Sequence, residues 1–224
     1  SGDSNMKNAF INNEDIHTST AARVFNIDIN QVNEEQRRNA KIVNFGIIYG
    51  VSAFGLSNQT NLTRGESKEI IDNYFKSYPK LKEYMSNQIS FAREKGYVET
   101  ILKRKRYLPE INSRNAMIRS SAERNAINTP VQGSAADIIK LAMIKIDSEL
   151  EKKSLKSKLL LQVHDELVFD VHLAELDIVK QIVLKNMENA IQIDVPLKVD
   201  IGNGDNWLVA VSYTHLRAHE TPIN

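Results

Sequence analysis

RRNAKIVNFGIIYGVSAFGL, residues 37–56, carries the strongest structural signal of the chain, because cations and aromatic rings recur in it at a fixed interval. Residues four apart lie on one face of an α-helix, and this interval joins Arg37, Lys41, Phe45 and Tyr49. The two cations suit a polyphosphate and the two rings suit a flat base, so this face fits a nucleoside triphosphate. The spacing alone favours a plainer alternative, an amphipathic helix with its rings in the core and its cations in solvent.

The residues around this row predict where the helix begins, ends and packs. Asn33 followed by Gln36 fits a capping box at the start of the helix. Gly50 fits a helix stop. A glycine inside a helix costs about 1 kcal/mol, so Gly46 indicates close approach of another group to the backbone. A different face of the helix has the spacing of a buried stripe, which leaves the row open to a ligand, and this stripe holds Ala40, Val43 and Ile47.

The composition is that of an ordinary globular protein. The 224 residues are 42% hydrophobic and 25% charged, which suffices for one domain or two small ones with a substantial core. A net charge of +1 does not itself indicate a nucleic-acid binder, and the positive charge is local, as at residues 103–106. Cysteine is absent, which excludes disulfides and fits a reducing compartment. No apolar run has membrane-spanning length and no secretory leader is visible, so we expect a cytoplasmic protein.

Helical periodicity dominates residues 13–95. A short β-rich connection follows over residues 96–111. Helical periodicity returns over residues 115–128 and is expected to stop at Pro130, which disrupts a regular helix. The next helix is expected to begin at a second capping box, formed by Ser134 and Asp137.

An acidic β-hairpin is predicted in the second half of the chain. Two apolar strands over residues 159–163 and 167–171 flank His164, Asp165 and Glu166, so the acidic groups lie at the tip. By sequence alone a polar turn is the favoured interpretation of this tip. The remaining predicted elements are a helix over residues 173–190 and a strand over residues 196–201.

Four stretches, in order along the chain, resemble family A DNA polymerases, the group of bacterial DNA polymerase I. The quoted run resembles the nucleotide-binding helix of the fingers, and DIHTSTAA at residues 15–22 resembles the segment that leads into it. AERNAINTPVQG at 122–133 resembles the palm segment that touches template and primer. LQVHDEL at 161–167 resembles the metal-binding hairpin of the palm. The resemblance implies an α+β fold, a truncated right-hand polymerase with helical fingers and a palm whose small antiparallel sheet carries the acidic hairpin.

The resemblance also implies how the row would hold a deoxynucleoside triphosphate. Arg37, Lys41 and His17 resemble the family's triphosphate contacts, and Lys41 is a candidate general acid for the leaving pyrophosphate. Phe45 resembles the ring that packs on the incoming sugar and base. Because Phe45 lacks a hydroxyl that could replace a missing sugar hydroxyl, we expect it to disfavour dideoxynucleotides. Tyr49 resembles the ring that guards the templating-base position.

Contacts with the primer–template duplex are implied for a second polar row. Arg124, Asn128 and Gln132 are four residues apart and would contact the duplex from the minor groove, whose degenerate acceptor pattern lets pairing be checked without reading sequence. His164 is expected to shape the hairpin turn or to touch the primer terminus.

The resemblance implies that Asp165 is a catalytic, metal-binding aspartate and that Glu166 is an adjacent supporting carboxylate. They would bind two Mg²⁺ ions, with Mn²⁺ as a possible substitute, since magnesium prefers carboxylate oxygens. The family's first catalytic aspartate is expected upstream of Ser1, so we expect this chain to be inactive by itself. A small metal-dependent hydrolase built on this tip is a weaker alternative, because no other ligand cluster accompanies it.

The resemblance leads to a provisional division of the chain. Residues 1–95 are expected to be mostly fingers, with the nucleotide-binding helix at about 34–50, and residues 96–210 to be a palm portion. Residues 211–224 resemble a translated sequencing adaptor and are expected to be a non-native tail. The expected function is template-directed DNA synthesis in replication or repair, with primer–template DNA and deoxynucleoside triphosphates as partners, no membrane, and a monomeric chain. The alternative is a fragment that binds nucleotide and DNA without catalysis.

Lys103 departs from the family, which usually has glycine at this tight turn. If the backbone there has a positive φ, lysine costs about 1 kcal/mol or somewhat more.

Overall fold

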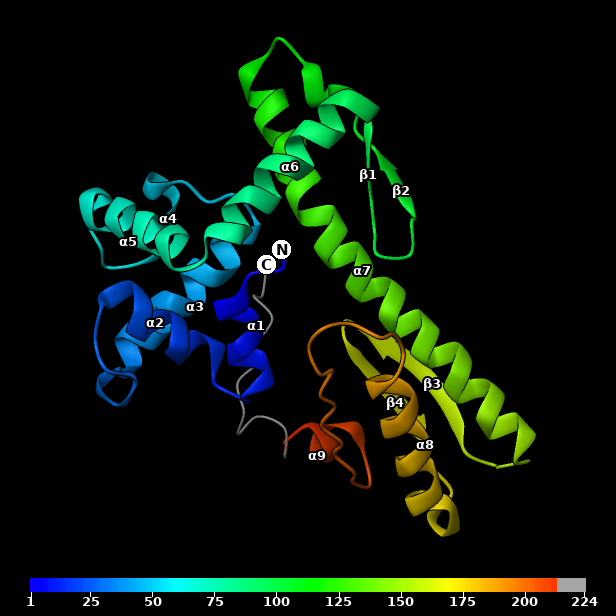
Figure 1. Cartoon of the computed structure of the whole chain (residues 1–224). Coiled ribbons are helices and arrows are strands. Elements are labelled where there is room, and N and C mark those ends of the chain that lie inside the picture. Colours follow the sequence, from blue (N-terminus) through cyan, green and yellow to red (C-terminus); the bar gives the residue numbers. More distant parts are fainter. Residues whose placement is uncertain (213–224) are drawn as a thin grey trace. The chain divides into compact units, whose positions relative to one another are not determined.

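The fold is α+β, as expected: helices dominate, and the strands form two separate two-stranded antiparallel sheets (Figure 1). The structure is a computed structural model and describes residues 1–212, so most of the tail predicted at 211–224 lies outside the described residues. The chain divides into two compact units, Ser1–Ala135 and Ala136–Asn224. Across the described residues, no helix combines the length and the apolar character that a membrane crossing needs.

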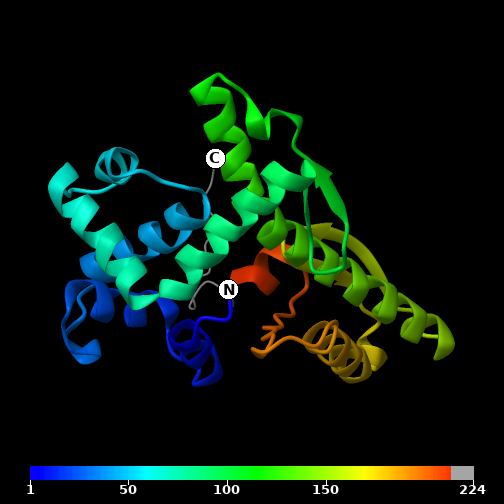
Figure 2. The same ribbon diagram turned by 45° about the horizontal axis from the view of Figure 1, so that its top comes forward.

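The first unit contains the helices that the sequence predicted for residues 13–95. In chain order they are α2 (Ile16–Phe25), the 3₁₀ turn η1 (Ile29–Gln31), α3 (Glu34–Ile48), α4 (Ala53–Gln59), α5 (Arg64–Ser77) and α6 (Pro79–Lys95). They follow α1 (Ser4–Ile11), a helix that lies outside the predicted range. The β-rich connection is a hairpin of β1 (Tyr97–Glu99) and β2 (Lys105–Tyr107), followed by η2 (Pro109–Asn112). Figure 2 shows this hairpin beginning at the end of α6.

Helix α3 begins and ends where the sequence predicted. The Asn33 side chain accepts a hydrogen bond from the Gln36 amide at 2.8 Å, and the Gln36 side chain accepts one from the Asn33 amide at 3.0 Å, which completes the capping box. Gly50 follows the helix with φ +70°, a conformation that favours glycine. At Gly46 an added Cβ would lie 2.7 Å from Val51 Cγ1, so the predicted close approach is made by Val51.

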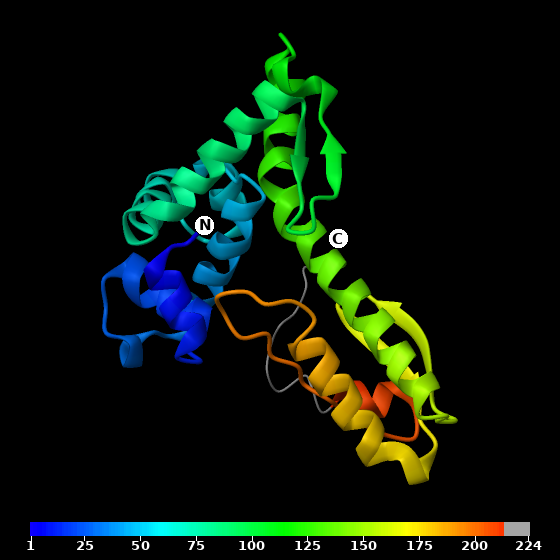
Figure 3. The same cartoon turned by 45° about the vertical axis from the view of Figure 1, so that its right-hand side comes forward.

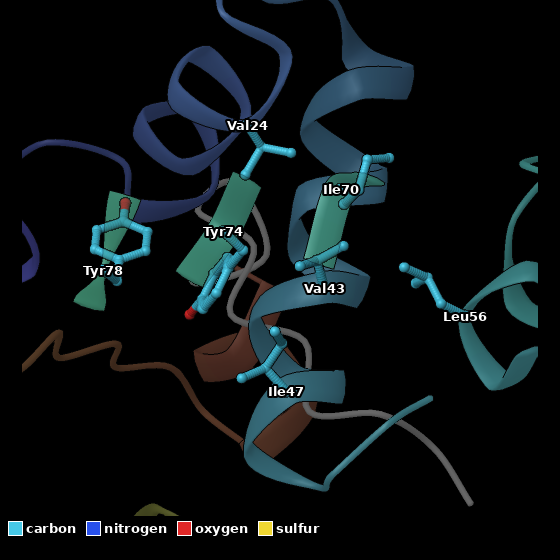
Figure 4. Close-up of a cluster of buried hydrophobic side chains, with 7 residues drawn as sticks. All are labelled: Val24, Val43, Ile47, Leu56, Ile70, Tyr74 and Tyr78. Carbon is cyan, nitrogen blue, oxygen red and sulfur yellow. The ribbon is translucent and has the colours of Figure 1, made fainter. Parts of the chain in front are cut away.

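The predicted stripe of α3 lies in the core of the first unit. Ala40, Val43 and Ile47 are at most 2% exposed. Burial of these side chains, at about 25 cal/mol per Å² of apolar surface, fixes which face of α3 points inward. Val43 and Ile47 belong to the cluster that Figure 4 shows, which consists of Val24, Val43, Ile47, Leu56, Ile70, Tyr74 and Tyr78.

The prediction that a helix stops at Pro130 is wrong. One helix, α7 (Ala116–Lys152), passes through this proline. Apolar residues on both flanks are buried: Ala122 and Ala126 lie in a core of the first unit, and Ala142 and Ile146 lie in the core of the second. This burial outweighs the roughly 3 kcal/mol that proline costs inside a helix.

The second capping box is therefore also wrong, because Ser134 and Asp137 lie inside α7. The Ser134 hydroxyl instead donates to the Pro130 carbonyl and accepts a hydrogen bond from the Ile101 amide at 2.8 Å. Ser134 thus holds the β1–β2 hairpin to α7 within the first unit.

The second unit contains the predicted acidic hairpin. Strands β3 (Lys158–Val163) and β4 (Glu166–Asp170) pair antiparallel, with Val163 opposite Glu166. Figure 3 shows the hairpin beside the C-terminal half of α7. Leu167 and Phe169 of β4 pack against a core formed by α7 and α8. The helix predicted over residues 173–190 is η3 (Leu173–Glu175) plus α8 (Leu176–Glu188), and a further short helix, α9 (Trp207–Ser212), was not predicted.

The strand predicted over residues 196–201 is absent from the described part of the chain. Residues 196–200 alternate between exposed and half-buried, as a strand pattern requires, but Ile201 breaks the alternation because it is exposed like Asp200. A strand also needs a neighbour to accept and donate its backbone hydrogen bonds, and no described strand pairs with this segment.

Lys103, where family A polymerases usually have glycine, has the positive φ that the resemblance suggested. Lys103 lies in the turn between β1 and β2 with φ +65°. Its side chain is 81% exposed and reaches Glu99 at 3.5 Å, a contact that stabilises the turn little.

Candidate nucleotide-binding and nucleic-acid-contacting residues

The row of cations and rings lies on the face of α3 that the buried stripe leaves open. Arg37, Lys41 and Phe45 are half-buried, and Tyr49, which ends the helix, is 40% exposed. The plainer alternative placed the rings in the core, and neither ring is buried there. The row therefore keeps its side chains accessible.

Arg37 is paired with an acidic residue that sequence analysis did not single out. Arg37 Nη2 lies 2.7 Å from Asp15 Oδ2, and both side chains remain partly exposed. Asp15 also caps α2 by accepting a hydrogen bond from the Thr18 amide at 2.8 Å. Partial burial raises the pKa of Asp15, but the hydrogen bonds from Arg37 and Thr18 and the charge of Arg37 outweigh it and lower this pKa to about 2. The carboxylate is therefore ionised at neutral pH.

His17 lies next to α3 and contacts it twice. Its ring centroid is 5.8 Å from that of Phe45, and its Nδ1 is 3.0 Å from Asn44 Nδ2. His17 is 5% exposed, so its ring orientation is fixed by packing. The structure thus brings together His17 and Phe45, two residues that sequence analysis assigned to the same ligand from separate stretches of the chain.

Tyr49 contacts the second polar row. Gln132 Nε2 donates a hydrogen bond to the Tyr49 hydroxyl at 2.6 Å. At the neighbouring Gly50, an added Cβ would lie 2.9 Å from Arg124 Cγ, so a larger residue would require the Arg124 side chain to shift, in addition to the strain of the positive φ. The end of α3 and the first part of α7 therefore touch within the first unit.

The second polar row lies on the continuous helix α7. Arg124 and Gln132 are exposed and Asn128 is half-buried. Arg124 donates to Ser120 Oγ at 3.0 Å. Asn128 Oδ1 is buried, and within the described residues it has no hydrogen-bond partner. An unpaired buried acceptor destabilises a fold, so packing does not explain why asparagine stands here.

The basic run at residues 103–106 is partly structural. Arg104 donates to the Gly133 carbonyl at 3.0 Å, and Arg106 donates to Thr129 Oγ1 at 3.0 Å. An added Cβ at Gly133 would lie 2.6 Å from Thr100 Cγ2. These contacts hold the β1–β2 hairpin against the segment of α7 that carries Asn128 and Gln132.

The acidic tip has the geometry of a tight turn. His164 has φ +52° and its carbonyl accepts a hydrogen bond from Gln162 Nε2 at 2.8 Å, which fits the turn-shaping role. Asp165 and Glu166 are exposed, and their oxygens are ligands that magnesium prefers. Among residues 1–212, no three His, Cys, Asp or Glu side chains gather closely enough to hold a metal ion. The two carboxylates therefore fit magnesium as part of a ligand set.

The comparisons with known proteins define the class of protein. The sequence profile of DNA polymerase family A matches residues 1–209, and the chain belongs to this family. Among its relatives, "DNA polymerase I" of Lactococcus lactis subsp. lactis is 53% identical over 94% of this chain. "DNA polymerase I" of Bacillus subtilis is 51% identical over 92%. The chain spans 24% of the length of each of these two relatives.

A solved structure agrees with the family assignment. The POL domain of Pol1 from M. smegmatis, in complex with DNA primer-template and dNTP, has a TM-score of 0.90 and is 42% identical. The match covers 93% of this chain and 37% of that one. The resemblance stated from sequence is thus confirmed at the level of family and fold.

Sequence analysis missed the partners of the predicted site residues. Asp15 and Asn44 contact Arg37 and His17, which lie far away in the chain, and no local spacing encodes such pairs. Asp15 was visible only as part of the DIHTSTAA stretch, where its capping role explains it without reference to Arg37.

Proposed function

We propose that this chain supplies the nucleotide-binding and primer–template-contacting parts of a polymerase that extends a DNA primer with deoxynucleoside triphosphates. The observation that carries the proposal is the open face of α3, where Arg37, Lys41 and Phe45 stand in order beside His17. Membership of family A supports DNA synthesis, and the DNA and dNTP bound by the M. smegmatis relative support the same two partners here.

The roles on α3 follow from charge and shape. Arg37, Lys41 and His17 hold the triphosphate, because fixed donors neutralise charge without reorganising during the reaction. Lys41 gives a proton to the leaving pyrophosphate. Phe45 packs on the sugar and base, and Tyr49 covers the position of the templating base.

The duplex contacts belong to α7 and the acidic tip. Arg124, Asn128 and Gln132 reach acceptors in the minor groove, where donors can sense correct pairing. His164 shapes the turn that presents Asp165, close to the primer terminus.

Asp165 and Glu166 would hold the two Mg²⁺ ions, or Mn²⁺ in their place, together with ligands from outside this pair. When bound, such ions activate the primer hydroxyl and stabilise the charge on the leaving pyrophosphate. The short strands β3 and β4 keep both carboxylates at one end of a hairpin, which limits their freedom before the ions arrive.

The division into fingers (residues 1–95) and palm (96–210) is part of the proposal, as are a cytoplasmic location and a monomeric chain. The boundary between compact units at Ala135 and Ala136 reflects packing density along the chain and does not decide where a functional subdomain begins.

Primer extension tests the proposal. In the full-length polymerase that carries this segment, Asp165→Ala should abolish extension on a defined template with magnesium and leave primer–template binding within about twofold. Asp170→Ala, which removes an exposed carboxylate at the other end of the same hairpin, is the matched control and should extend normally. Normal extension by Asp165→Ala would overturn the role of the acidic tip.

A second candidate is binding without catalysis by the 224-residue chain itself. Two adjacent carboxylates supply too few ligands for two octahedral ions, which favours this outcome for the isolated chain. Nucleotide titration together with an extension assay separates the candidates. Binding with no product supports the second, and magnesium-dependent product that is lost in Asp165→Ala contradicts it.

A further inference from the structure

A series of buried, hydrogen-bonded polar side chains lies behind α3 and includes His17. Its members come from α2, from α3 and from the junction of α5 and α6, and all are at most 8% exposed: His17, Thr20, Asn44 and Tyr78. We propose that Thr20, Asn44 and Tyr78 are positioning residues that hold the His17 imidazole in the tautomer with its proton on Nε2, so that the ring offers a donor to a nucleotide phosphate. This proposal rests on the proposed role of His17 in nucleotide binding.

The orientation of the Asn44 amide sets the direction of the hydrogen bonds that connect Thr20 to His17. The Thr20 hydroxyl donates to Asn44 Oδ1 at 3.2 Å, which turns Asn44 Nδ2 toward His17 Nδ1 at 3.0 Å. An amide nitrogen can only donate, so Nδ1 of His17 must accept and cannot carry a proton. The single proton of the neutral ring then lies on Nε2.

Tyr78 is the last member of this hydrogen-bonded series, on the side away from His17. The Thr20 hydroxyl donates its only proton to Asn44. In the 3.3 Å contact between the Thr20 and Tyr78 hydroxyls, Tyr78 must therefore be the donor. Burial raises the pKa of Tyr78, which keeps this proton in place. The ring of Tyr78 packs against that of Tyr74 in the core, with the two ring centroids 5.0 Å apart (Figure 4). This packing restricts the movement of the Tyr78 hydroxyl.

Packing alone does not require these polar side chains in the core. Apolar side chains of the same shape could fill such positions with little loss of stability. A histidine that offers an acceptor would repel a phosphate oxygen, whereas an Nε2–H donor forms a charge-assisted hydrogen bond with it. Thr20 and Asn44 thus act on the nucleotide through His17, without touching it.

Nuclear magnetic resonance of ¹⁵N-labelled histidine tests the tautomer directly. In the full 224-residue chain at slightly alkaline pH, the two-bond ¹H–¹⁵N correlations of His17, identified by their loss in His17→Gln, should show protonated Nε2 and unprotonated Nδ1. Thr20→Val removes the hydroxyl with little change of shape and should shift the ring toward a mixture of tautomers. Thr20→Ser should restore the original pattern. A protonated Nδ1 in the wild-type chain, or an unchanged pattern in Thr20→Val, overturns the proposal.

Two further variants distinguish positioning from general loosening. Tyr78→Phe removes the first donor but leaves the Thr20 hydroxyl free to bond Asn44, so its effect should be in the same direction as Thr20→Val and smaller. Tyr74→Phe removes a hydroxyl from the neighbouring ring in the same core and should leave the tautomer unchanged. A change in Tyr74→Phe as large as that in Thr20→Val would mean that core packing, and not the hydrogen-bond chain, sets the tautomer.

Nucleotide titration links the tautomer to binding. Loss of one well-placed hydrogen bond corresponds to roughly a threefold to tenfold rise in the Kd for dATP in Thr20→Val, and Thr20→Ser should reverse it. An unchanged Kd in Thr20→Val with a changed tautomer overturns the link to phosphate. If the wild-type chain binds no dATP while His17 shows the expected tautomer, the proposed function fails and the hydrogen-bond chain stands.

Discussion

Asp15→Asn should tighten the binding of a deoxynucleoside triphosphate, because Asp15 competes with phosphate for Arg37. The two side chains meet at 2.7 Å, and the low pKa of Asp15, about 2, means that the competing carboxylate is charged at any pH near neutrality. Asparagine keeps the shape of the side chain and is an equally good helix cap. The substitution thus removes one negative charge beside the cation and little else.

The magnitude follows from the exposure of the pair. Both side chains are a third or more exposed, so the ion pair contributes about 0.5–1 kcal/mol. A phosphate that replaces the Asp15 carboxylate at Arg37 must first break this ion pair. Without the carboxylate, the Kd for the deoxynucleoside triphosphate should therefore fall about twofold to fivefold. Loss of the ion pair together with the loss of charge at the start of α2 should lower the free energy of unfolding by about 1–2 kcal/mol.

Titration with dATP at low and high salt measures both effects. The gain in affinity should shrink as salt screens the charges. Asp28→Asn is the matched control, since Asp28 also caps a helical turn, η1, by accepting a hydrogen bond from the Asn30 amide, and it should leave the Kd unchanged. Weaker binding by Asp15→Asn would show that the carboxylate positions Arg37 for the nucleotide, and an equal effect in the control would show that Arg37 is not the affected cation.

Three other substitutions have defined outcomes. Phe45→Tyr in the full-length polymerase should raise the ratio of dideoxynucleotide to deoxynucleotide incorporation; a constant ratio in competition assays would place the ring away from the sugar. Lys103→Gly should raise the free energy of unfolding by about 0.5–1 kcal/mol, because φ is +65° there, and Lys105→Gly, inside β2, should lower it in the same denaturation experiment. Glu175→Gln should destabilise the chain above pH 4.5 and progressively less as the pH falls toward 2. The Ser157 hydroxyl and the amides of residues 156 and 157 hold the folded pKa at about 2, below its ordinary 4.5, so this stabilisation is present above the unfolded pKa and is lost as the pH falls through the folded one. A constant difference between the two unfolding curves across this pH range would refute the last prediction.

Local patterns were predictable from the sequence because they depend on residues within one turn of helix or one hairpin. The Asn33–Gln36 capping box, the buried stripe of α3 and the acidic hairpin are all confirmed. Helix boundaries that depend on tertiary packing were not predictable. Pro130 has a strong intrinsic tendency to end a helix, and only burial on both of its flanks overrides it.

For the candidate site, too, the local pattern was predictable and the long-range contacts were not. Spacing identified Arg37, Lys41, Phe45 and Tyr49 as one row, but it could not identify what each of them contacts. Asp15 lies 22 residues from Arg37 and Gln132 lies 83 residues from Tyr49. Such pairs are set by the fold of the whole first unit, so a sequence pattern identifies the residues of the row without identifying their partners.

These partners change how ligand binding should be understood. Arg37 already has a carboxylate, and the Tyr49 hydroxyl already has the Gln132 amide. A triphosphate at one end of α3 and a template base at the other would therefore exchange existing contacts for new ones. Each exchange costs the contact that is given up, which is small at the partly exposed ion pair, and the ligand must supply more than that cost. The exchange therefore favours a ligand with enough negative charge to replace Asp15 at Arg37, by at most about fivefold for an ion pair worth about 0.5–1 kcal/mol.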